Sequence, residues 1–155
     1  MAESTYADKE IQLVVFKLGR EDYGITILQV QEIKRIMDIT RVPNSPDYIK
    51  GVINLRGSVL PVIDLKKRLA LPPVDATDDT RIIIVKVEEI VVGLIVDGVS
   101  EVTSLSSDNI EPPHTVVSGV SAQYLSGVGK QADNLLILLN LAAIVGVGAD
   151  SVKAV

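Results

Sequence analysis

Few residues of this chain carry side chains that could perform catalysis or hold a metal. Its 155 residues include one histidine, His114, and no cysteine. Disulfides are therefore excluded, and a tetrahedral site of His and Cys ligands is almost unreachable. A Ser-His-Asp arrangement is formally possible, but no Gly-x-Ser-x-Gly elbow occurs to position the serine. We interpret His114, which follows Pro112-Pro113, as a surface loop residue.

Two other groups of residues resemble known ion or phosphate sites only in part. Asp75, Asp78 and Asp79 lack the alternating ligand positions and the terminal Glu of a calcium loop. Gly127-Val-Gly-Lys130 is followed by Gln131, where a phosphate-binding loop has Ser or Thr. The sequence therefore predicts no metal site and no cofactor, and we expect no enzymatic activity.

The most distinctive motif is Gly51-Val-Ile-Asn-Leu-Arg-Gly57, followed by Ser58-Val-Leu-Pro-Val-Ile-Asp-Leu65. Gly51 and Gly57 allow backbone conformations that other residues disfavour, so we assign them to structural turns with Arg56 at an exposed apex. Two roles for Arg56 are equally open. Its guanidinium could cap carbonyls or pair with a nearby acid, or it could present a fork of donors to a partner's carboxylates.

The composition favours a globular, soluble protein. Hydrophobic residues make up 47% of the chain and charged residues 23%, which is enough to bury a core. The net charge of -5 argues against nucleic acid as a partner, because phosphate contacts need clustered Lys and Arg. The N-terminus has no apolar signal region, and the apolar run 135–147 is shorter than a membrane span. We expect no membrane insertion and a cytoplasmic protein.

Valine and isoleucine dominate the hydrophobic residues and favour β-strands. Gly19-Arg-Glu-Asp22 and Arg56-Gly57 are typical of turns between strands. Asp64 is positioned to cap one short helix, which we expect to end before Pro72-Pro73. The predicted strands cover residues 12–18, 23–28, 30–36, 52–55, 59–63, 81–87, 90–96, 99–105, 124–128 and 135–139, with a short helix or turn at 140–145.

The two halves of the chain repeat one pattern. Tyr23-Gly-Ile-Thr-Ile-Leu-Gln-Val-Gln-Glu-Ile33 lies over Val92-Gly-Leu-Ile-Val-Asp-Gly-Val-Ser-Glu-Val102, an offset of 69 residues. Residues 48–52 lie over 124–128, and 60–65 over 136–141, both at an offset of 76. Constant offsets indicate a duplicated β unit with an insertion in the second copy, although similar strand patterns can also match by chance.

The duplication predicts a mostly β fold of two pseudo-symmetric five-stranded barrels with short helices. We expect one domain over residues 1–155, with subdomains at about 12–71 and 80–145 joined by a linker at 72–79. A unit of about 65 residues is marginal alone, so the two copies should share or adjoin a core. The groove between them is then the expected binding site.

The motif 51–57, with Pro61-Val-Ile-Asp-Leu65 downstream, resembles the hallmark of the CheW family. Tyr23-Gly-Ile, Val30-Gln-Glu-Ile33 and Val92-Gly-Leu-Ile-Val-Asp-Gly-Val99 also match, in the right order. The resemblance covers about residues 12–144. It implies two SH3-like barrels and a non-enzymatic cytoplasmic adaptor, a monomer when free, that couples chemoreceptors to the CheA histidine kinase. The partners that it implies are the helical tip of a chemoreceptor and the regulatory domain of CheA.

The resemblance also implies sites for both partners. The receptor tip would lie in an apolar groove, and the kinase would contact the first subdomain. Val30 and Ile33 are three residues apart, so a bulge or bend is needed before both can face one way. For each apolar residue, plain core packing is at least as good an explanation. The implied receptor-binding residues are Ile27, Val30, Ile33, Arg56, Val99 and Val102, and the implied kinase-binding residues are Glu32, Ile39 and Val42.

Other functions remain as alternatives. A kinase fragment or a coupling protein fused to a receiver domain is disfavoured, because the chain lacks kinase motifs and ends at Val155. A small β-barrel enzyme or ligand carrier would use Asp64, Glu101 or His114. Turnover or a tightly held metabolite would favour that alternative.

Overall fold

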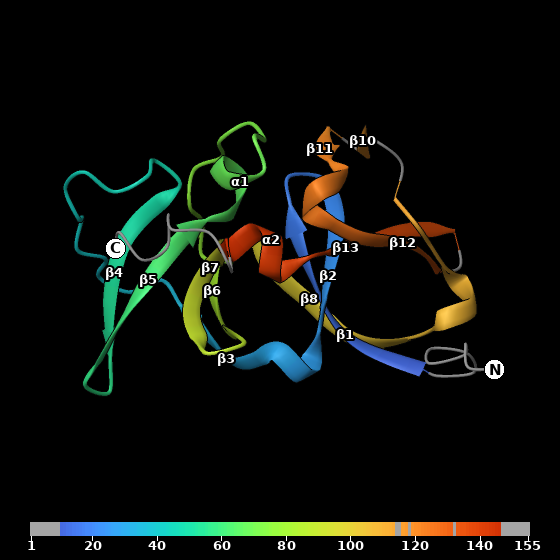
Figure 1. Ribbon diagram of the computed structural model, residues 1–155, viewed down its shortest axis with the longest axis horizontal. Helices are drawn as coiled ribbons and strands as arrows, with labels where there is room; N and C mark the ends of the chain where they lie inside the picture. Colours follow the sequence, from blue (N-terminus) through green and yellow to red (C-terminus); the bar gives the residue numbers. More distant parts are fainter. Residues whose placement is uncertain (1–9, 114–115, 118, 132, 147–155) are drawn as a thin grey trace.

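The computed structural model describes residues 10–113, 116–117, 119–131 and 133–146, which form two main β-sheets packed face to face (Figure 1). The first sheet, called sheet B, has the order β3-β6-β7-β5-β4. Its strands are β3 (Val30–Arg35), β4 (Ile49–Leu55), β5 (Ser58–Asp64), β6 (Arg81–Val87) and β7 (Ile90–Val96).

The second sheet, called sheet A, has the order β8-β1-β2-β13-β12-β9. Its strands are β1 (Glu10–Leu18), β2 (Glu21–Thr26), β8 (Gly98–Ser106), β9 (Ile110–Glu111), β12 (Leu125–Gln131) and β13 (Asn134–Leu139). Short elements join them: η2 (Ile27–Gln29), α1 (Leu65–Arg68), η3 (Ser107–Asn109), β10 (Val116–Val117), β11 (Val120–Ser121), η4 (Ala122–Tyr124) and α2 (Leu141–Val145).

The predicted fold class is confirmed, and the sequence repeat explains its symmetry. With the repeat as a guide, β8-β1-β2-β13-β12 corresponds to β3-β6-β7-β5-β4 strand by strand. Each sheet contains one parallel pairing at the equivalent place, β2 with β13 and β7 with β5. The small strand β9 is an addition to sheet A.

The strands of each predicted subdomain, 12–71 and 80–145, are divided between the two sheets. Strands β1 and β2 belong to the first half of the sequence but lie in sheet A, with strands of the second half. Conversely, β6 and β7 complete sheet B. Each barrel therefore combines the first two strands of one repeat with the last three principal strands of the other repeat. Both repeats have the same hydrophobic pattern, so that pattern alone does not indicate which copy a strand joins.

The core has three layers because both sheets are buried on both faces. On β6, Ile82 and Ile84 point into the interior of the sheet B barrel, whereas Ile83 and Val85 point between the sheets. On β1, Leu13 points into the sheet A barrel. This double burial accounts for the continuous apolar runs in the sequence. The layer between the sheets is the largest cluster and is shared by both barrels.

The two short helices follow equivalent strands and meet at one arginine. As predicted, Asp64 caps α1, and its Oδ1 accepts a hydrogen bond from the Lys67 N–H at 3.3 Å. From α1, Arg68 Nε donates to the Ile144 carbonyl at 2.8 Å. Its guanidinium lies 4.2 Å from the ring centre of Tyr48 and 5.2 Å from that of Tyr124. Arg68 thus links the end of α2 in one repeat to α1 in the other through this hydrogen bond.

Candidate protein-interaction surfaces

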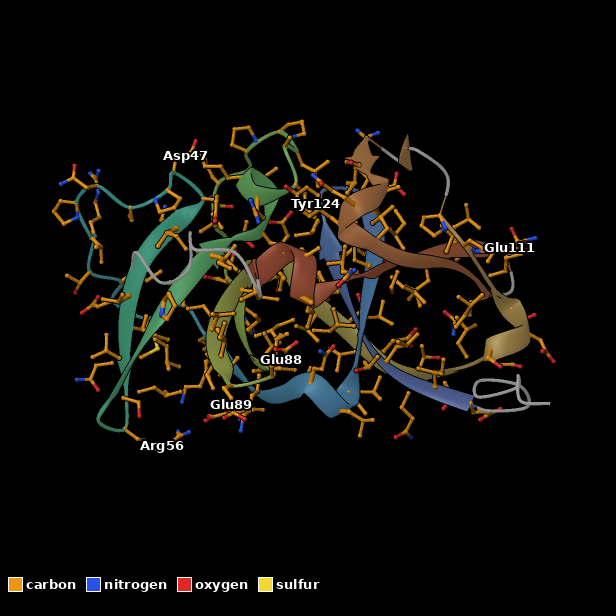
Figure 2. The ribbon with its side chains drawn as sticks, in the orientation of Figure 1. Asp47, Arg56, Glu88, Glu89, Glu111 and Tyr124 are labelled. Carbon is orange, nitrogen blue, oxygen red and sulfur yellow. The ribbon has the colours of Figure 1, made fainter. Side chains whose placement is uncertain are left out.

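The β4–β5 hairpin places Arg56 at an exposed tip (Figure 2). Leu55 pairs with Ser58, so the connection has only two residues, Arg56 at φ 51° and Gly57 at φ 88°. Two positive φ angles define the tight turn that matches the twist of a hairpin, and glycine adopts the second at little cost. The Gly57 N–H also donates to Asn54 Oδ1 at 3.1 Å. Gly57 is therefore the structural turn residue that the sequence predicts.

Arg56 pairs with Glu32 across the open edge of sheet B. Its Nη1 donates to Glu32 Oε1 at 3.3 Å, and its Nη2 contacts Oε2, so the pairing is two-pronged. Glu32 lies on β3 and Arg56 follows β4, which are the first and last strands of the sheet. The contact therefore closes the barrel. Of the two roles left open for Arg56, pairing with a nearby acid is realised, yet 66% of its side chain stays exposed.

Gly51 is needed for a close backbone approach. A Cβ at this position would lie 2.3 Å from the Thr40 carbonyl oxygen, far inside van der Waals contact. Thr40 and Val52 exchange two backbone hydrogen bonds of 2.8 and 2.9 Å. Gly51 thereby allows the segment that contains Ile39 and Val42 to pack against β4. It lies inside β4, at a register shift, and not in the turn to which we assigned it from the sequence.

Beside this segment lies a shallow pocket of about 510 Å³, here called the hairpin face. Ile39 packs on the barrel interior, and Val42 is partly buried with its carbonyl accepting the Ser45 hydroxyl at 2.8 Å. Val59, on the rim, is 65% exposed. The residues of the hairpin face are Met37, Asp38, Thr40, Val52, Ile53, Asn54 and Val59.

Met37 and Val59 were not predicted as surface contacts from the sequence. The alternation of β5 could have predicted the exposure of Val59. This apolar residue precedes the buried Leu60, so its side chain points to the opposite, outward face of the strand. Met37 lies outside any regular strand, so no periodicity predicts the direction of its side chain.

A second surface, here called the interbarrel edge, consists of Ile27, Val30, Ile33, Val99 and Val102. Ile27, Val30 and Val99 are partly buried against the shared core. Ile33 is 41% exposed and Val102 is 55% exposed. These last two occupy equivalent positions of the repeat on β3 and β8, each the first strand of its sheet. Apolar side chains that remain half exposed at such positions are available to a partner.

Two β-bulges orient this set as the sequence argument required. On β3, Val30 lies opposite Val85 and Glu32 opposite Ile84, so Gln31 is an extra residue. The bulge restores Ile33 to the face of Val30, because residues opposite each other in antiparallel strands share a face. On β8 the register shifts equivalently, with Val99 opposite Phe16 and Glu101 opposite Val15. The required bulge is thus present in both repeats.

The predicted receptor set does not lie on one surface. Glu32 lies opposite Ile84, whose side chain points into the barrel, so Glu32 and its partner Arg56 are on the other face of β3 from Val30 and Ile33. The structure groups Arg56 with Glu32 and near the hairpin face rather than with the five residues of the interbarrel edge.

The residues considered for catalysis are not brought together in the described part of the chain. Asp64 caps a helix, and Glu101 is an exposed strand residue. Lys130, from the glycine-containing motif, lies on β12 and pairs with Glu111 at 2.7 Å. No group of three or more His, Asp or Glu suited to a metal occurs among the described residues, and His114 lies outside them. Within the same residues no helix is long and apolar enough to cross a membrane.

Comparison of this chain with known proteins shows its family. A family model described as a CheW-like domain matches residues 12–147. The chain is 42% identical to the chemotaxis protein CheW of Klebsiella aerogenes, over 84% of this chain and 78% of the relative. It is 40% identical to the chemotaxis protein CheW of Bacillus subtilis, over 86% and 85%. The crystal structure of the scaffolding protein TtCheW from Thermoanaerobacter tengcongensis superposes with a TM-score of 0.81 at 39% identity, covering 88% of both chains.

Two fused barrels that carry apolar surfaces, together with these relatives, define a scaffolding adaptor rather than an enzyme. The chain belongs to the CheW family, as its sequence motifs suggested. It is a coupling adaptor of chemotaxis signalling and does not itself turn over a substrate.

Proposed function

We propose that this adaptor couples the helical tip of a chemoreceptor to the regulatory domain of the CheA kinase in the cytoplasm. The interbarrel edge takes the receptor, and the hairpin face with Arg56 and Glu32 takes the kinase. The free protein is a monomer. The observation that carries this proposal is that Glu32, with its partner Arg56, lies on the opposite face of β3 from Val30 and Ile33 of the interbarrel edge.

The chemistry of each surface suits its proposed partner. The interbarrel edge is a row of β-branched side chains without a charge among its five members, which fits the apolar face of a helical hairpin. The hairpin face combines four apolar residues with Asp38, Thr40 and Asn54, and the exposed Arg56 stands beside it with further N–H donors to offer. Because one strand links both surfaces, binding at one can shift the population of states at the other.

The test is a pull-down of this protein with a CheA regulatory domain and, separately, with a receptor cytoplasmic fragment. We expect Ile33→Ser with Val102→Ser to weaken receptor capture at least about tenfold and to spare kinase capture. We expect Val59→Ser and Arg56→Ala to do the reverse.

The matched control is Leu135→Ser. Leu135 is the repeat equivalent of Val59 and is 58% exposed, but it lies in sheet A, away from both surfaces. It should leave both captures unchanged. Loss of both partners in every variant, or capture of neither partner by folded wild-type protein, would refute the assignment.

A further inference from the structure

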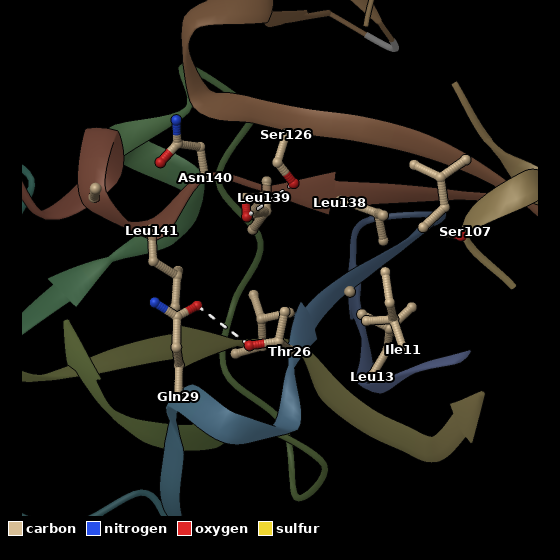
Figure 3. Close-up of a pocket in the computed structure, with 14 residues that line it drawn as sticks. Ile11, Leu13, Thr26, Gln29, Ser107, Ser126, Leu138, Leu139, Asn140 and Leu141 are labelled. Atoms are coloured by element: carbon tan, nitrogen blue, oxygen red, sulfur yellow. Dashed lines mark hydrogen bonds between the residues drawn. The ribbon is translucent and has the colours of Figure 1, made fainter. Parts of the chain in front are cut away.

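A pocket of about 540 Å³ opens on the sheet A barrel beside η2, the element that contributes Ile27 to the interbarrel edge (Figure 3). Its floor is apolar and buried, with Leu13, Leu138 and Leu139 each at most 6% exposed. Thr26 and Gln29 lie on one wall and the exposed Ser126 lies on the rim. The pocket shares no residue with the interbarrel edge or the hairpin face.

At the positions of the repeat that correspond to Ala142 and Leu28, the other barrel has an ion pair. There, Lys66 of α1 contacts Asp97, which connects β7 to β8. Both side chains are largely buried, at 9% and 20% exposed. The repeat places Ala142 where Lys66 would be and Leu28 where Asp97 would be.

These two replacements leave the sheet A barrel without an equivalent of the Lys66–Asp97 pair, which is here called the plug. Ala142 lines the pocket with a methyl group only. Leu28 is 93% exposed and so turns away from the position that Asp97 fills. The same backbone framework therefore carries a bridged gap in one barrel and an open pocket in the other.

The lining of the pocket limits what it can hold. None of its fourteen lining residues is charged, so it offers no counter-ion to a charged ligand. Thr26 Oγ1 donates to Gln29 Oε1 at 3.5 Å, and Ser126 Oγ donates to the Leu139 carbonyl at 3.5 Å. Both bonds are long and weak, so these groups can pair with a ligand at little cost. The volume falls in the range of small-molecule sites.

We propose that this pocket binds a neutral, mainly apolar small molecule whose single polar group pairs with Thr26 or Gln29. The site would give the adaptor a ligand-responsive element between β2, η2 and α2. It goes beyond the coupling function, and its lining residues belong to neither partner surface.

The test uses N-phenylnaphthylamine, a neutral aromatic amine whose fluorescence rises in apolar sites. Titration of the wild-type protein should give a saturable increase with one site per chain. The double variant Leu28→Asp/Ala142→Lys builds the plug of the other barrel and should weaken binding at least about tenfold. Val59→Ser, which removes an exposed apolar side chain elsewhere, should leave binding unchanged.

If the double variant fails to fold by circular dichroism, Ala142→Phe fills the pocket from α2 and takes its place in the comparison. Absence of saturable binding overturns the proposal, as does binding that persists in a folded, plugged variant. Displacement of the probe from wild-type protein by the CheA regulatory domain or the receptor fragment would identify the occupant as a protein partner and overturn the small-molecule assignment. The coupling proposal is judged separately by its own pull-downs.

Discussion

The two barrels share one strand order but close their edges with different chemistry. In the sheet B barrel, the first and last strands are joined by the Arg56–Glu32 ion pair. In the sheet A barrel, β8 and β12 are joined by a neutral hydrogen bond from Gln131 Nε2 to Thr103 Oγ1 at 2.6 Å. Neutral groups are sufficient to bridge such an edge. The charge at the Arg56 tip is therefore more than closure requires, which agrees with a role in recognition.

A second difference concerns the gap between each short helix and the neighbouring strand connection. One gap contains the Lys66–Asp97 pair, and Asp97 Oδ2 also accepts the Gly19 N–H at 2.7 Å. The other is the apolar pocket beside Ala142. The two equivalent frameworks differ in their side chains, so that an ion pair bridges one gap and the other gap is open.

The largest expected effect tests whether the shared core makes the barrels one cooperative unit. Ile83 is fully buried between the sheets, so Ile83→Ala should lower the free energy of unfolding by about 2–5 kcal/mol. Hydrogen exchange should then accelerate for core amides of β1 and β2 in sheet A as well as for those of sheet B. Ile82→Ala, whose side chain points into one barrel only, is the matched control for packing loss. Acceleration confined to sheet B in the Ile83 variant would show that the barrels unfold separately.

Breaking the bridged gap should have the next largest effect. Lys66→Met leaves the largely buried Asp97 carboxylate without its counter-ion, and we expect destabilisation of about 2 kcal/mol in urea unfolding. The control is Lys130→Met, which breaks an exposed pair with Glu111 and should cost at most about 0.5 kcal/mol. Equal costs for the two variants would remove the proposed distinction between the bridged gap and an ordinary surface pair.

The two edge closures should differ in their response to salt. A double-mutant cycle of Arg56→Met and Glu32→Gln should give a coupling of about 0.5 kcal/mol that shrinks in high salt, since the pair is exposed. A cycle of Gln131→Met and Thr103→Val should give a coupling of about 1 kcal/mol that salt leaves unchanged. Similar salt responses in the two cycles would mean that charge does not distinguish the closures.

The smallest expected effect concerns Tyr23, at a position where the other repeat has Val92. Burial, with a smaller contribution from Glu21, raises the pKa of the Tyr23 hydroxyl to about 12. The unfolded chain ionises first, so this group's stabilising contribution is complete below about pH 10 and is lost as the pH rises toward 12. Tyr23→Phe should abolish that part of the alkaline loss, measured by urea unfolding at about pH 8 and about pH 11.

At neutral pH the same variant should change stability by less than about 1 kcal/mol. The hydroxyl is buried, and the described residues provide it with no hydrogen-bond partner, so its removal breaks no bond. An unchanged alkaline slope in Tyr23→Phe would assign the pH dependence to other groups.

The sequence predicted the local elements and their symmetry well, because these depend on short-range patterns. The turn at Arg56-Gly57, the Asp64 cap and the bulge near Val30 follow from residue types or spacing, whereas the equivalent bulge near Val99 was not predicted. The helix over 64–71 is shorter than expected, since α1 ends at Arg68 and Ala70 takes a positive φ of 60°.

The long-range pairing of strands and side chains could not be predicted from the sequence. Strand exchange between repeats and the contact of Arg56 with Glu32 depend on which of two similar strands meets another, and local propensity carries no such information. The open pocket could have been anticipated only by asking which residues stand at the positions equivalent to Lys66 and Asp97 in the other repeat. The assignment of individual residues to receptor or kinase remains a prediction.

The exchange of strands also constrains how the chain folds as it is synthesised. The β1–β2 hairpin is made first, but its neighbours in the sheet are β8, from Gly98, and β13, which ends at Leu139. The β1 edge of the hairpin therefore stays unpaired until β8 has been translated, and the β2 edge until β13 has been translated. Such high contact order slows folding and exposes strand edges to other nascent chains. A truncation after the first repeat should therefore aggregate rather than yield a folded half.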